Sequence, residues 1–484
     1  MTARSLHWFR DDLRLADNPA LAAAVAHGAV LCLYVFDEGS SRRQLGGASR
    51  WWLARSLKSL AASIQARGGE LVIMRGDPAD ILPRVAEAAD IALVTWSRRY
   101  DAGSIALDSA IKTKLVAAAT KVESFNASLL NEPWQVTTKT GDPMKVFTPY
   151  WRAARERGDP PAPLPAPVRI EALKLPAAVQ AMTMSLGDLA LEPSEPDWAG
   201  GLRDAWTPGE DGAAARLHDF LTGQLDGYGE GRNRPDYVST SRLSPSLRFG
   251  EIGPRQIWHA TRSAIESGKA QAGAGDAEKF LSEIGWREFS YHLLFYNPDL
   301  ATKNYNRRFD VFPWRQDDVA LSAWQRGRTG YPIVDAGLRE LWTMGWMHNR
   351  VRMIVASFLI KHLLIDWRQG EAWFWDTLVD ADPANNTASW QWVAGSGADA
   401  APYYRIFNPV TQGLKFDPKG GYVRRWIPEI AGLDDSVIHE PWKADASSLR
   451  RAGVVLGDTY PRPIVDLDVG RKRALEALAS TRGD

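Results

Sequence analysis

Residues 376–397 read DTLVDADPANNTASWQWVAGSG, and we expect the rest of the chain to be organised around this stretch. It holds three carboxylates, two adjacent amides and two tryptophans, namely Asp376, Asp380, Asp382, Asn385, Asn386, Trp390 and Trp392. Apolar residues flank it, so it should lie at the edge of a core, where an unpaired buried polar group costs roughly 2–7 kcal/mol. A large polar ligand would satisfy these groups. A polar loop that caps a helix is the other interpretation.

The bulk composition limits the class of protein. At 484 residues, of which 45% are hydrophobic, the chain can fill the cores of two or three domains. Charged residues from Arg4 onward break up any apolar run typical of a signal peptide. The strongest candidate for a membrane span, residues 351–367, is interrupted by Lys361, His362 and Asp366. We therefore expect a soluble, cytoplasmic protein without a membrane contact.

Several common kinds of site are excluded. The single cysteine, Cys32, cannot form an internal disulfide or a cysteine-ligated zinc or iron–sulfur site within one chain. His348 has no second histidine at ligand spacing, so we expect no metal. The signatures G-x-S-x-G, Walker loop and H-E-x-x-H are missing. Net charge is zero, so only a local basic patch would indicate nucleic acid.

Residues 1–130 alternate short apolar runs with helical periodicity. Strands are expected over residues 5–9, 30–36, 70–75, 91–96 and 122–125, and helices over 18–27, 49–67, 78–89 and 104–119. This βαβ rhythm predicts a Rossmann-like parallel α/β domain, in which ligands lie beyond the carboxyl ends of the strands. No G-x-G-x-x-G follows the first strand. A small ligand at this edge and simple loop polarity both stay open.

The remainder divides into a connector and a helical domain. Residues 131–208 are rich in Pro and Gly and predict a long connector over the surface. Residues 209–484 are expected to be helical, with helices over 213–225, 254–267, 277–295, 333–345, 350–364 and 370–378.

Three sets of residues in the helical domain indicate binding. The hydroxyls of Thr240, Ser241 and Ser244 precede expected helices, where they would bind a phosphate or simply cap the helices. The second set is one helical face of Phe280, Glu283, Trp286 and Arg287. The third is a face of Trp346, Asn349, Arg352 and Met353. The second set also suits an amphipathic surface, and the third suits an ordinary helix start.

Seven segments resemble signatures of the photolyase/cryptochrome family, in the order of that family and over nearly the whole chain. They are WFRDDLRLADNPAL, TSRLSPSLRFGEI, WREFSYHLL, GYPIVDAGLREL, GWMHNRVRMIVASFL, LIDWRQGEAWFW and DADPANNTASWQWVAGSGADAAPYYRIFNP. The resemblance is greatest to the cyclobutane pyrimidine dimer (CPD) photolyases of the class III/class I branch. It implies an α/β antenna-binding domain, a linker and an all-helical domain that holds a U-shaped FAD.

The resemblance assigns FAD contacts residue by residue. They would be Tyr228, Thr240, Ser241, Leu243, Ser244, Arg287, Trp346, Asn349, Arg352, Asp380, Asp382 and Asn386. Arg352 paired with Asp380 is the usual arrangement beside the isoalloxazine. Asn386 matches the residue that faces flavin N5, typically Asn in photolyases and Asp in plant cryptochromes. An amide cannot give up a proton as an acid does, which suits an enzyme that uses fully reduced anionic flavin.

The lesion would lie against residues of the same region. Glu283, Trp286, Met353 and Trp392 match residues that hold the flipped dimer, with the two tryptophans on either side of it. The catalytic candidates are Glu283, Asn349, Met353 and Asn386. The candidates for DNA contact are Arg232, Arg234, Arg242, Arg248, Arg350, Arg424 and Arg425. A (6-4) photolyase would carry paired histidines where this chain has only His348.

Electron transfer and the antenna follow from the resemblance as well. Trp390, Trp367 and Trp314 match the three-tryptophan chain to FAD, although three scattered tryptophans alone would suggest core packing. The segment SRWWLARSL after Asp37 and Glu38 resembles plant cryptochromes and class III photolyases. It implies methenyltetrahydrofolate in the N-terminal cleft with Glu38 as a contact, while a deazaflavin or no antenna stays open.

The implied function is light-driven repair of cyclobutane pyrimidine dimers in UV-damaged DNA by a monomeric carbon–carbon lyase. Excited reduced FAD would donate an electron to the flipped dimer. The alternative is a cryptochrome-type blue-light photoreceptor without repair activity. The short tail after Pro441 and the retained lesion residues favour the enzyme. A flavoprotein that binds DNA without activity is a third possibility.

Overall fold

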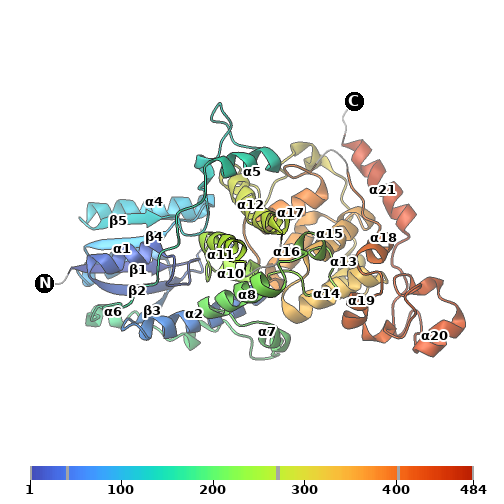
Figure 1. Ribbon diagram of the computed structural model, residues 1–484, viewed down its shortest axis with the longest axis horizontal. Coiled ribbons are helices and arrows are strands. Elements are labelled where there is room, and N and C mark those ends of the chain that lie inside the picture. Colours follow the sequence, from blue (N-terminus) through green and yellow to red (C-terminus); the bar gives the residue numbers. More distant parts are fainter. Residues whose placement is uncertain (1–2, 40–42, 269–272, 401–403, 482–484) are drawn as a thin grey trace.

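The computed structural model describes residues 3–39, 43–268, 273–400 and 404–481. A parallel sheet lies at one end of the molecule and a larger helical body at the other (Figure 1). The strands are β1 (Arg4–Phe9), β2 (Ala29–Phe36), β3 (Leu71–Arg75), β4 (Leu93–Ser97) and β5 (Lys121–Phe125), in the order β3-β2-β1-β4-β5. The predicted α/β class and all five expected strands are confirmed.

Helices cover both faces of this sheet. They are α1 (Pro19–His27), α2 (Gly47–Gln65), α3 (Pro78–Ala88) and α4 (Ala102–Ala117). Alternate residues of β2 point to opposite faces: Cys32 and Tyr34 pack with α1 and α2, whereas Leu31 and Leu33 pack with α3 and α4. A strand buried on both faces has no polar side, which is why the sequence of β2 is a continuous apolar run.

Residues 131–208 are more ordered than the Pro-rich composition predicts. They contain α5 (Phe147–Glu156), α6 (Ala177–Gln180) and α7 (Gly200–Ala205). The expectation of a patternless surface connector is wrong at α5, which buries Phe147, Tyr150 and Ala154 on one side. Trp151 of α5 lies so close to Gly285 that a Cβ there would overlap the indole ring. The domain limits at 130 and 208 stay a prediction.

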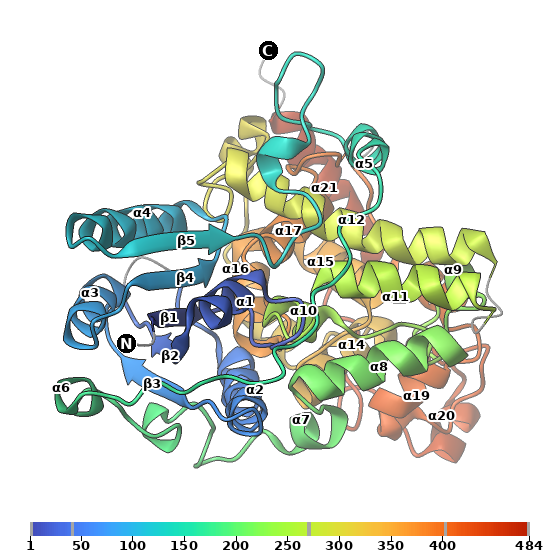
Figure 2. The same ribbon diagram turned by 60° about the vertical axis from the view of Figure 1, so that its left-hand side comes forward.

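The helical body contains every helix expected from the sequence, along with several others. The expected ones are α8 (Glu210–Gly223), α11 (Pro254–Glu266), α12 (Ala274–Tyr296), α14 (Pro332–Met344), α15 (Asn349–Ser357) and α16 (Trp367–Thr377). The others are α9 (Tyr228–Gly231), α10 (Ser244–Arg248), α13 (Asp318–Gln325), α17 (Asn385–Ala394), α18 (Pro409–Phe416), α19 (Gly421–Trp426), α20 (Ala446–Ala452) and α21 (Leu467–Ser480). Figure 2 shows α12, α15, α16 and α17 gathered in the middle of the molecule. Within the described residues, we find no helix with the length and apolar character that crossing a membrane requires.

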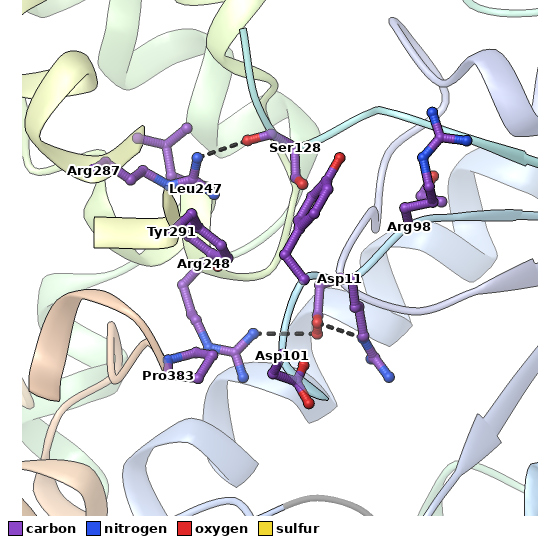
Figure 3. Close-up of a pocket in the computed structure, with 12 residues that line it drawn as sticks. Asp11, Arg98, Asp101, Ser128, Leu247, Arg248, Arg287, Tyr291 and Pro383 are labelled. Atoms are coloured by element: carbon purple, nitrogen blue, oxygen red, sulfur yellow. Dashed lines mark hydrogen bonds and ion pairs between the residues drawn. The ribbon is translucent and has the colours of Figure 1, made fainter. Parts of the chain in front are cut away.

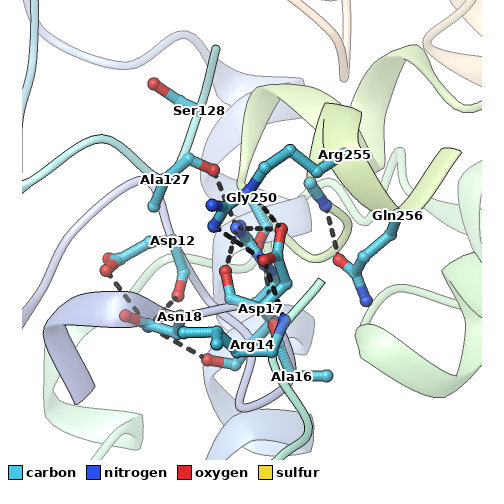
Figure 4. Close-up of polar contacts among 12 residues, drawn as sticks. Asp12, Arg14, Ala16, Asp17, Asn18, Ala127, Ser128, Gly250, Arg255 and Gln256 are labelled. Carbon is cyan, nitrogen blue, oxygen red and sulfur yellow. Dashed lines mark hydrogen bonds and ion pairs between the residues drawn. The ribbon is translucent and has the colours of Figure 1, made fainter. Parts of the chain in front are cut away.

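A buried arginine joins the two halves of the chain (Figure 4). The Arg14 side chain is fully buried and donates to backbone carbonyls of Ala16, Asp17, Ala127 and Gly250 at 2.7–2.9 Å. Asp17 in turn accepts Arg255 of α11 at 2.7 Å. Burial lowers the pKa of Arg14, and the negative charge of Asp17 opposes this shift. The neighbouring carboxylate therefore compensates the buried cation.

A second buried connection depends on pH. Oε1 of Glu251 accepts the Trp52 indole N–H at 2.9 Å and the Gly209 N–H at 2.7 Å. The carboxyl is fully buried, and burial raises its pKa from the usual 4.5 to about 7. The folded protein therefore holds a proton that the unfolded chain releases, and stability is lost as pH rises from 4.5 to 7.

We predict that Glu251→Gln gains stability relative to the parent protein as pH rises from 5 to 8, because glutamine cannot ionise. The gain should reach at most about 3 kcal/mol, the free energy of a pKa shift of this size. Thermal unfolding at several pH values measures it. Glu266, with 69% of its side chain exposed, provides the control Glu266→Gln. A pH-independent difference for Glu251→Gln would contradict the prediction.

Candidate active site

The stretch quoted at the outset runs from the last two residues of α16 through a polar turn to the body of α17. Asp382 Oδ1 accepts the backbone N–H groups of Ala384 at 2.9 Å and Asn385 at 2.8 Å, while Oδ2 accepts the Tyr291 hydroxyl at 2.6 Å. The capping interpretation is therefore confirmed for Asp382. Its predicted role as an FAD contact stays a prediction, since protein groups already hold both carboxylate oxygens.

Four of the predicted cofactor residues meet at one point. Arg352 of α15 donates to both carboxylate oxygens of Asp380, at 3.1 and 2.8 Å. Ser244, at the start of α10, donates to Asp380 at 2.6 Å and lies 3.3 Å from the Trp346 indole nitrogen. The structure thus contains the arginine–carboxylate pair that the resemblance implied, and it brings the 240–252 and 345–353 segments together with α17.

Asn386 is oriented by a carboxylate that the sequence did not single out. Its side-chain nitrogen donates to Glu371 Oε1 at 2.8 Å and to the Glu371 carbonyl at 3.1 Å. Both amide hydrogens are used on α16, so the amide oxygen of Asn386 points away from Glu371. The Thr387 hydroxyl also donates to Glu371, at 3.3 Å. This carboxylate lies within LIDWRQGEAWFW, but its spacing alone could not reveal the partner.

The surroundings of His348 carry an excess of positive charge. Burial and the charges of Arg242, Arg350, Arg352 and Arg232 lower the pKa of the imidazole to about 3. Its backbone N–H and the Tyr422 hydroxyl donate to the buried Glu340, at 3.2 and 2.6 Å. Among the described residues, buried Nε2 of His348 has no hydrogen-bond partner. Several arginines around one uncharged ring suit a polyanionic ligand.

The other predicted cofactor residues do not contact the group formed by Arg352, Asp380, Ser244 and Trp346 through any hydrogen bond described above. Tyr228 and Leu243 are buried in one apolar cluster with Phe280. Thr240 and Ser241 are half-buried before α10, and Asn349 is exposed at the start of α15.

Arg287 faces a pocket between the two halves of the molecule rather than the Asp380 cluster (Figure 3). It donates to the Ser128 carbonyl at 2.6 Å and lies over Tyr291 at 4.9 Å. The opposite wall of this pocket carries Asp11, which pairs with Arg248 at 3.1 Å. Asp11, just beyond β1, and Ser128, just beyond β5, therefore hold the two halves together at this point.

The predicted lesion residues lie on α12, α15 and α17. Glu283 forms an ion pair with Arg232. Arg350 donates to Asn233 at 2.5 Å and lies 3.6 Å from the sulfur of Met353. The connector, predicted from the sequence to lack regular structure, places Phe147 of α5 against this region.

The two tryptophans expected on either side of the lesion have protein neighbours of their own. One face of the Trp286 ring is covered by Phe147 of α5, at 3.7 Å between ring centres and an angle of 11°. The Trp392 indole N–H donates to the Asp399 carbonyl at 3.1 Å. For Phe147, the only signal in the sequence is the amphipathic spacing of Phe147, Tyr150 and Ala154 in a Pro-rich segment.

Two of the arginines proposed for DNA are already paired within the protein. Arg248 is buried, with 2% of its side chain exposed, and is held by Asp11 and by the Ala381 carbonyl at 2.7 Å. Arg424 is held by the Leu433 carbonyl at 2.7 Å and Asp435 at 2.8 Å. The prediction that Arg248 contacts phosphate is wrong, because a guanidinium between two domains cannot reach a duplex.

Two of the three tryptophans of the predicted electron chain are buried, and the third is partly buried. Trp390 and Trp367 are buried, with 2% and 0% exposed, and Trp314 is partly buried at the edge of the same cluster. The Trp390 ring packs on the backbone of α16 at Gly370, three residues after Trp367. The Trp367 indole N–H donates to buried Asn304 at 2.9 Å. Their role in electron transfer stays a prediction.

A separate cleft lies at the carboxyl ends of β1 and β2. Its lining includes Trp8, Arg10, Tyr34, Asp37 and Arg43. Glu38, the predicted antenna contact, lies next to Asp37 and pairs with Arg50 at 2.9 Å. In the described part of the chain, no three His, Cys, Asp or Glu side chains gather as ligands for a metal ion.

Two family models match this chain. Residues 280–480 match the FAD binding domain of DNA photolyase, and residues 5–168 match DNA photolyase. The chain belongs to the photolyase/cryptochrome family. It is 51% identical over 482 residues to the deoxyribodipyrimidine photo-lyase of Agrobacterium fabrum, covering 99% of this chain and 98% of that one. Cryptochrome-1 of Arabidopsis thaliana is 40% identical over 98% of this chain and 70% of its own length.

A solved structure extends this match to three dimensions. The crystal structure of a class III photolyase from Agrobacterium tumefaciens superposes with a TM-score of 0.95 at 51% identity, covering 100% of this chain and 98% of the other. The resemblance found in the seven sequence segments is therefore confirmed, as is a C-terminal domain of the FAD-binding type.

We predict that Gly370→Ala displaces the Trp390 ring, because an alanine Cβ would overlap it. The cost should be about 1–3 kcal/mol of stability from overpacking, reduced by the better helix propensity of alanine. Thermal unfolding and near-UV circular dichroism of the tryptophans measure it. The control is Gly223→Ala in α8, where a Cβ meets open space. Equal behaviour of the two variants would contradict close packing at Gly370.

Proposed function

We propose that this protein is a deoxyribodipyrimidine photo-lyase that repairs cyclobutane pyrimidine dimers in DNA in the light. The observation that carries the proposal is the 51% identity with a photo-lyase over both chains almost in full. The retained Glu283, Trp286, Met353 and Trp392 on α12, α15 and α17 support it, since these are the residue types expected to hold a dimer.

FAD, when bound and reduced, would supply the electron that light makes available for ring opening. The residues of this chain would bind and orient the cofactor and the substrate. Arg352, Asp380, Ser244 and Trp346 would hold the cofactor, and the hydroxyls of Thr240 and Ser241 would face its pyrophosphate. Asn386 would present its amide oxygen to flavin N5, because Glu371 takes both amide hydrogens. An amide at this point accepts a hydrogen bond and releases no proton.

The substrate side of the site would be formed by Glu283 and its neighbours. Glu283 would exchange Arg232 for a hydrogen bond to a base of the dimer, and Arg232 and Arg350 would then be available to phosphate. Asn349 and Met353 would contact the dimer from α15. Trp286 and Trp392 would border it, with Phe147 supporting the first ring from behind.

We also propose methenyltetrahydrofolate as the antenna in the N-terminal cleft, with Glu38 at its edge. Aromatic rings of Trp8 and Tyr34 suit a flat pteridine, and the guanidinium of Arg43 suits the carboxylates of its glutamate tail. Extraction of the chromophores and their absorption spectra would distinguish a folate from a deazaflavin.

A cryptochrome-type photoreceptor is the second candidate, favoured by the 40% identity with a plant cryptochrome. Purified, chemically reduced protein illuminated on dimer-containing DNA separates the two. Restoration of intact thymines supports the photo-lyase; unchanged dimers would leave the photoreceptor as the better proposal.

We predict that Glu283→Ala lowers repair per absorbed photon about tenfold, as loss of a hydrogen bond to a charged group costs about 1.5–3 kcal/mol. FAD content should not change. Glu283→Gln keeps a hydrogen-bonding group without the charge. Its repair per absorbed photon should lie between that of the parent protein and that of Glu283→Ala. Loss of flavin from Glu283→Ala would show that the residue belongs to the cofactor site instead.

For electron transfer, we predict that Trp390→Phe slows light-driven reduction of the flavin at least tenfold, because phenylalanine is far harder to oxidise than tryptophan. Repair by protein reduced chemically beforehand should persist. Transient absorption after a flash measures the first effect and dimer splitting the second. Full-rate photoreduction in Trp390→Phe would mean that electrons enter by another route.

A further inference from the structure

One short segment of the N-terminal domain lies along α16 of the helical domain. Trp375 donates its indole N–H to the Gln44 carbonyl at 2.7 Å. Asp376 accepts the backbone N–H of Gly47 at 2.9 Å, at the start of α2. A Cβ on Gly46 would overlap the backbone at Trp375, so the backbones of the two segments are in direct contact here. Asp376, which the family resemblance left without a role, thus caps a helix of the other domain.

Arg43 precedes this contact and reaches a buried carboxylate. Its Nη1 lies 2.7 and 2.9 Å from the two carboxylate oxygens of Glu371, and its guanidinium lies over the Trp375 ring at 4.3 Å. The Glu371 side chain is only 5% exposed, whereas that of Arg43 is 40% exposed. A carboxylate this buried needs a cation or hydrogen bonds, and the cation comes from the N-terminal domain.

Glu371 is also the group that orients Asn386, through Oε1 at 2.8 Å and its carbonyl at 3.1 Å. The same Oε1 accepts Arg43 at 2.7 Å. One oxygen atom therefore joins an arginine of the N-terminal cleft to the amide assigned to flavin N5. The charge of that oxygen acts in a partly buried site, where electrostatic effects are stronger than in water.

We propose that Arg43 is a positioning residue that sets the reduction potential of the flavin through Glu371 and Asn386. The inference rests on the proposed role of Asn386 beside the flavin. With Arg43 in place, the carboxylate is neutralised and negative charge on reduced flavin is tolerated. Without it, an uncompensated carboxylate behind Asn386 disfavours that charge. Arg43 also lines the N-terminal cleft. A ligand in that cleft would therefore be electrostatically linked to the flavin through Arg43, Glu371 and Asn386.

The test is the midpoint potential of the bound flavin in purified full-length variants. Arg43→Gln should lower it by at least about 30 mV, a tenfold change in a two-electron equilibrium. Glu371→Gln removes the negative charge and leaves the Arg43 cation unpaired, so it should raise the midpoint potential. Arg43→Gln with Glu371→Gln should lie between the single variants, and Arg43→Lys should restore most of the shift, because lysine keeps the charge.

A matched pair elsewhere supplies the control. Arg55 of α2 also pairs with a glutamate, Glu192, at 2.5 Å and lies over a tryptophan, Trp51, at 5.9 Å. Arg55 is about as exposed as Arg43, at 35%, while its partner Glu192 is 42% exposed. Arg55→Gln removes an ion pair that does not involve Glu371 and should leave the potential unchanged. Unfolding temperatures of all variants separate a loss of folding from a change in potential.

Unchanged potentials, or shifts of the same sign in Arg43→Gln and Glu371→Gln, would overturn the proposal and leave a merely structural ion pair. The potential is measured without DNA, so it does not depend on repair. A parent protein that binds flavin but repairs nothing would refute the proposed function and leave this measurement intact.

Discussion

The arrangement depends on buried polar groups whose hydrogen bonds are completed by partners from the other half of the chain. Arg14 donates to three carbonyls of its own half, those of Ala16, Asp17 and Ala127, and to the Gly250 carbonyl of the helical body. A guanidinium without water must find such partners, and the full set is present only when the sheet and the helical body are docked. Glu251 with Trp52, and Glu371 with Arg43, repeat the principle. The position of the domains is therefore fixed by hydrogen-bond geometry as well as by apolar packing.

The same constraint gives the active site its precision. The residues expected to face a ligand are each held from behind: Asp380 by Arg352, Asn386 by Glu371, and Trp286 by Phe147. Such support leaves one orientation available to each side chain. Preorganisation of this kind keeps a cofactor and a substrate at fixed positions without reorganisation during the reaction.

Local patterns in the sequence were sufficient for the sheet and for the long helices, because strand length, apolar runs and helical spacing are properties of neighbouring residues. The family resemblance supplied the functional class and most of the proposed site. What escaped prediction depends on distant partners. α5 was hidden by flanking Pro and Gly, and its helical form is explained by packing against α12 at Gly285. Arg248 was assigned to DNA because sequence shows a charge but not its burial beside Asp11. Asp376 accepts the backbone N–H of Gly47, which lies 329 positions away and could not be predicted as its partner.

Identity with both photo-lyases and plant cryptochromes means that membership in the family does not by itself choose between repair and signalling. On the proposed role of Asn386 beside the flavin, this choice depends on the atoms around Asn386. The match to the FAD-binding family model begins at residue 280, yet Arg43 of the N-terminal domain pairs with the carboxylate behind Asn386. The domain with the proposed antenna cleft would therefore also contribute a charge to the proposed redox site. On this proposal, the flavin chemistry of the protein would be a property of the docked pair of domains rather than of the helical domain alone.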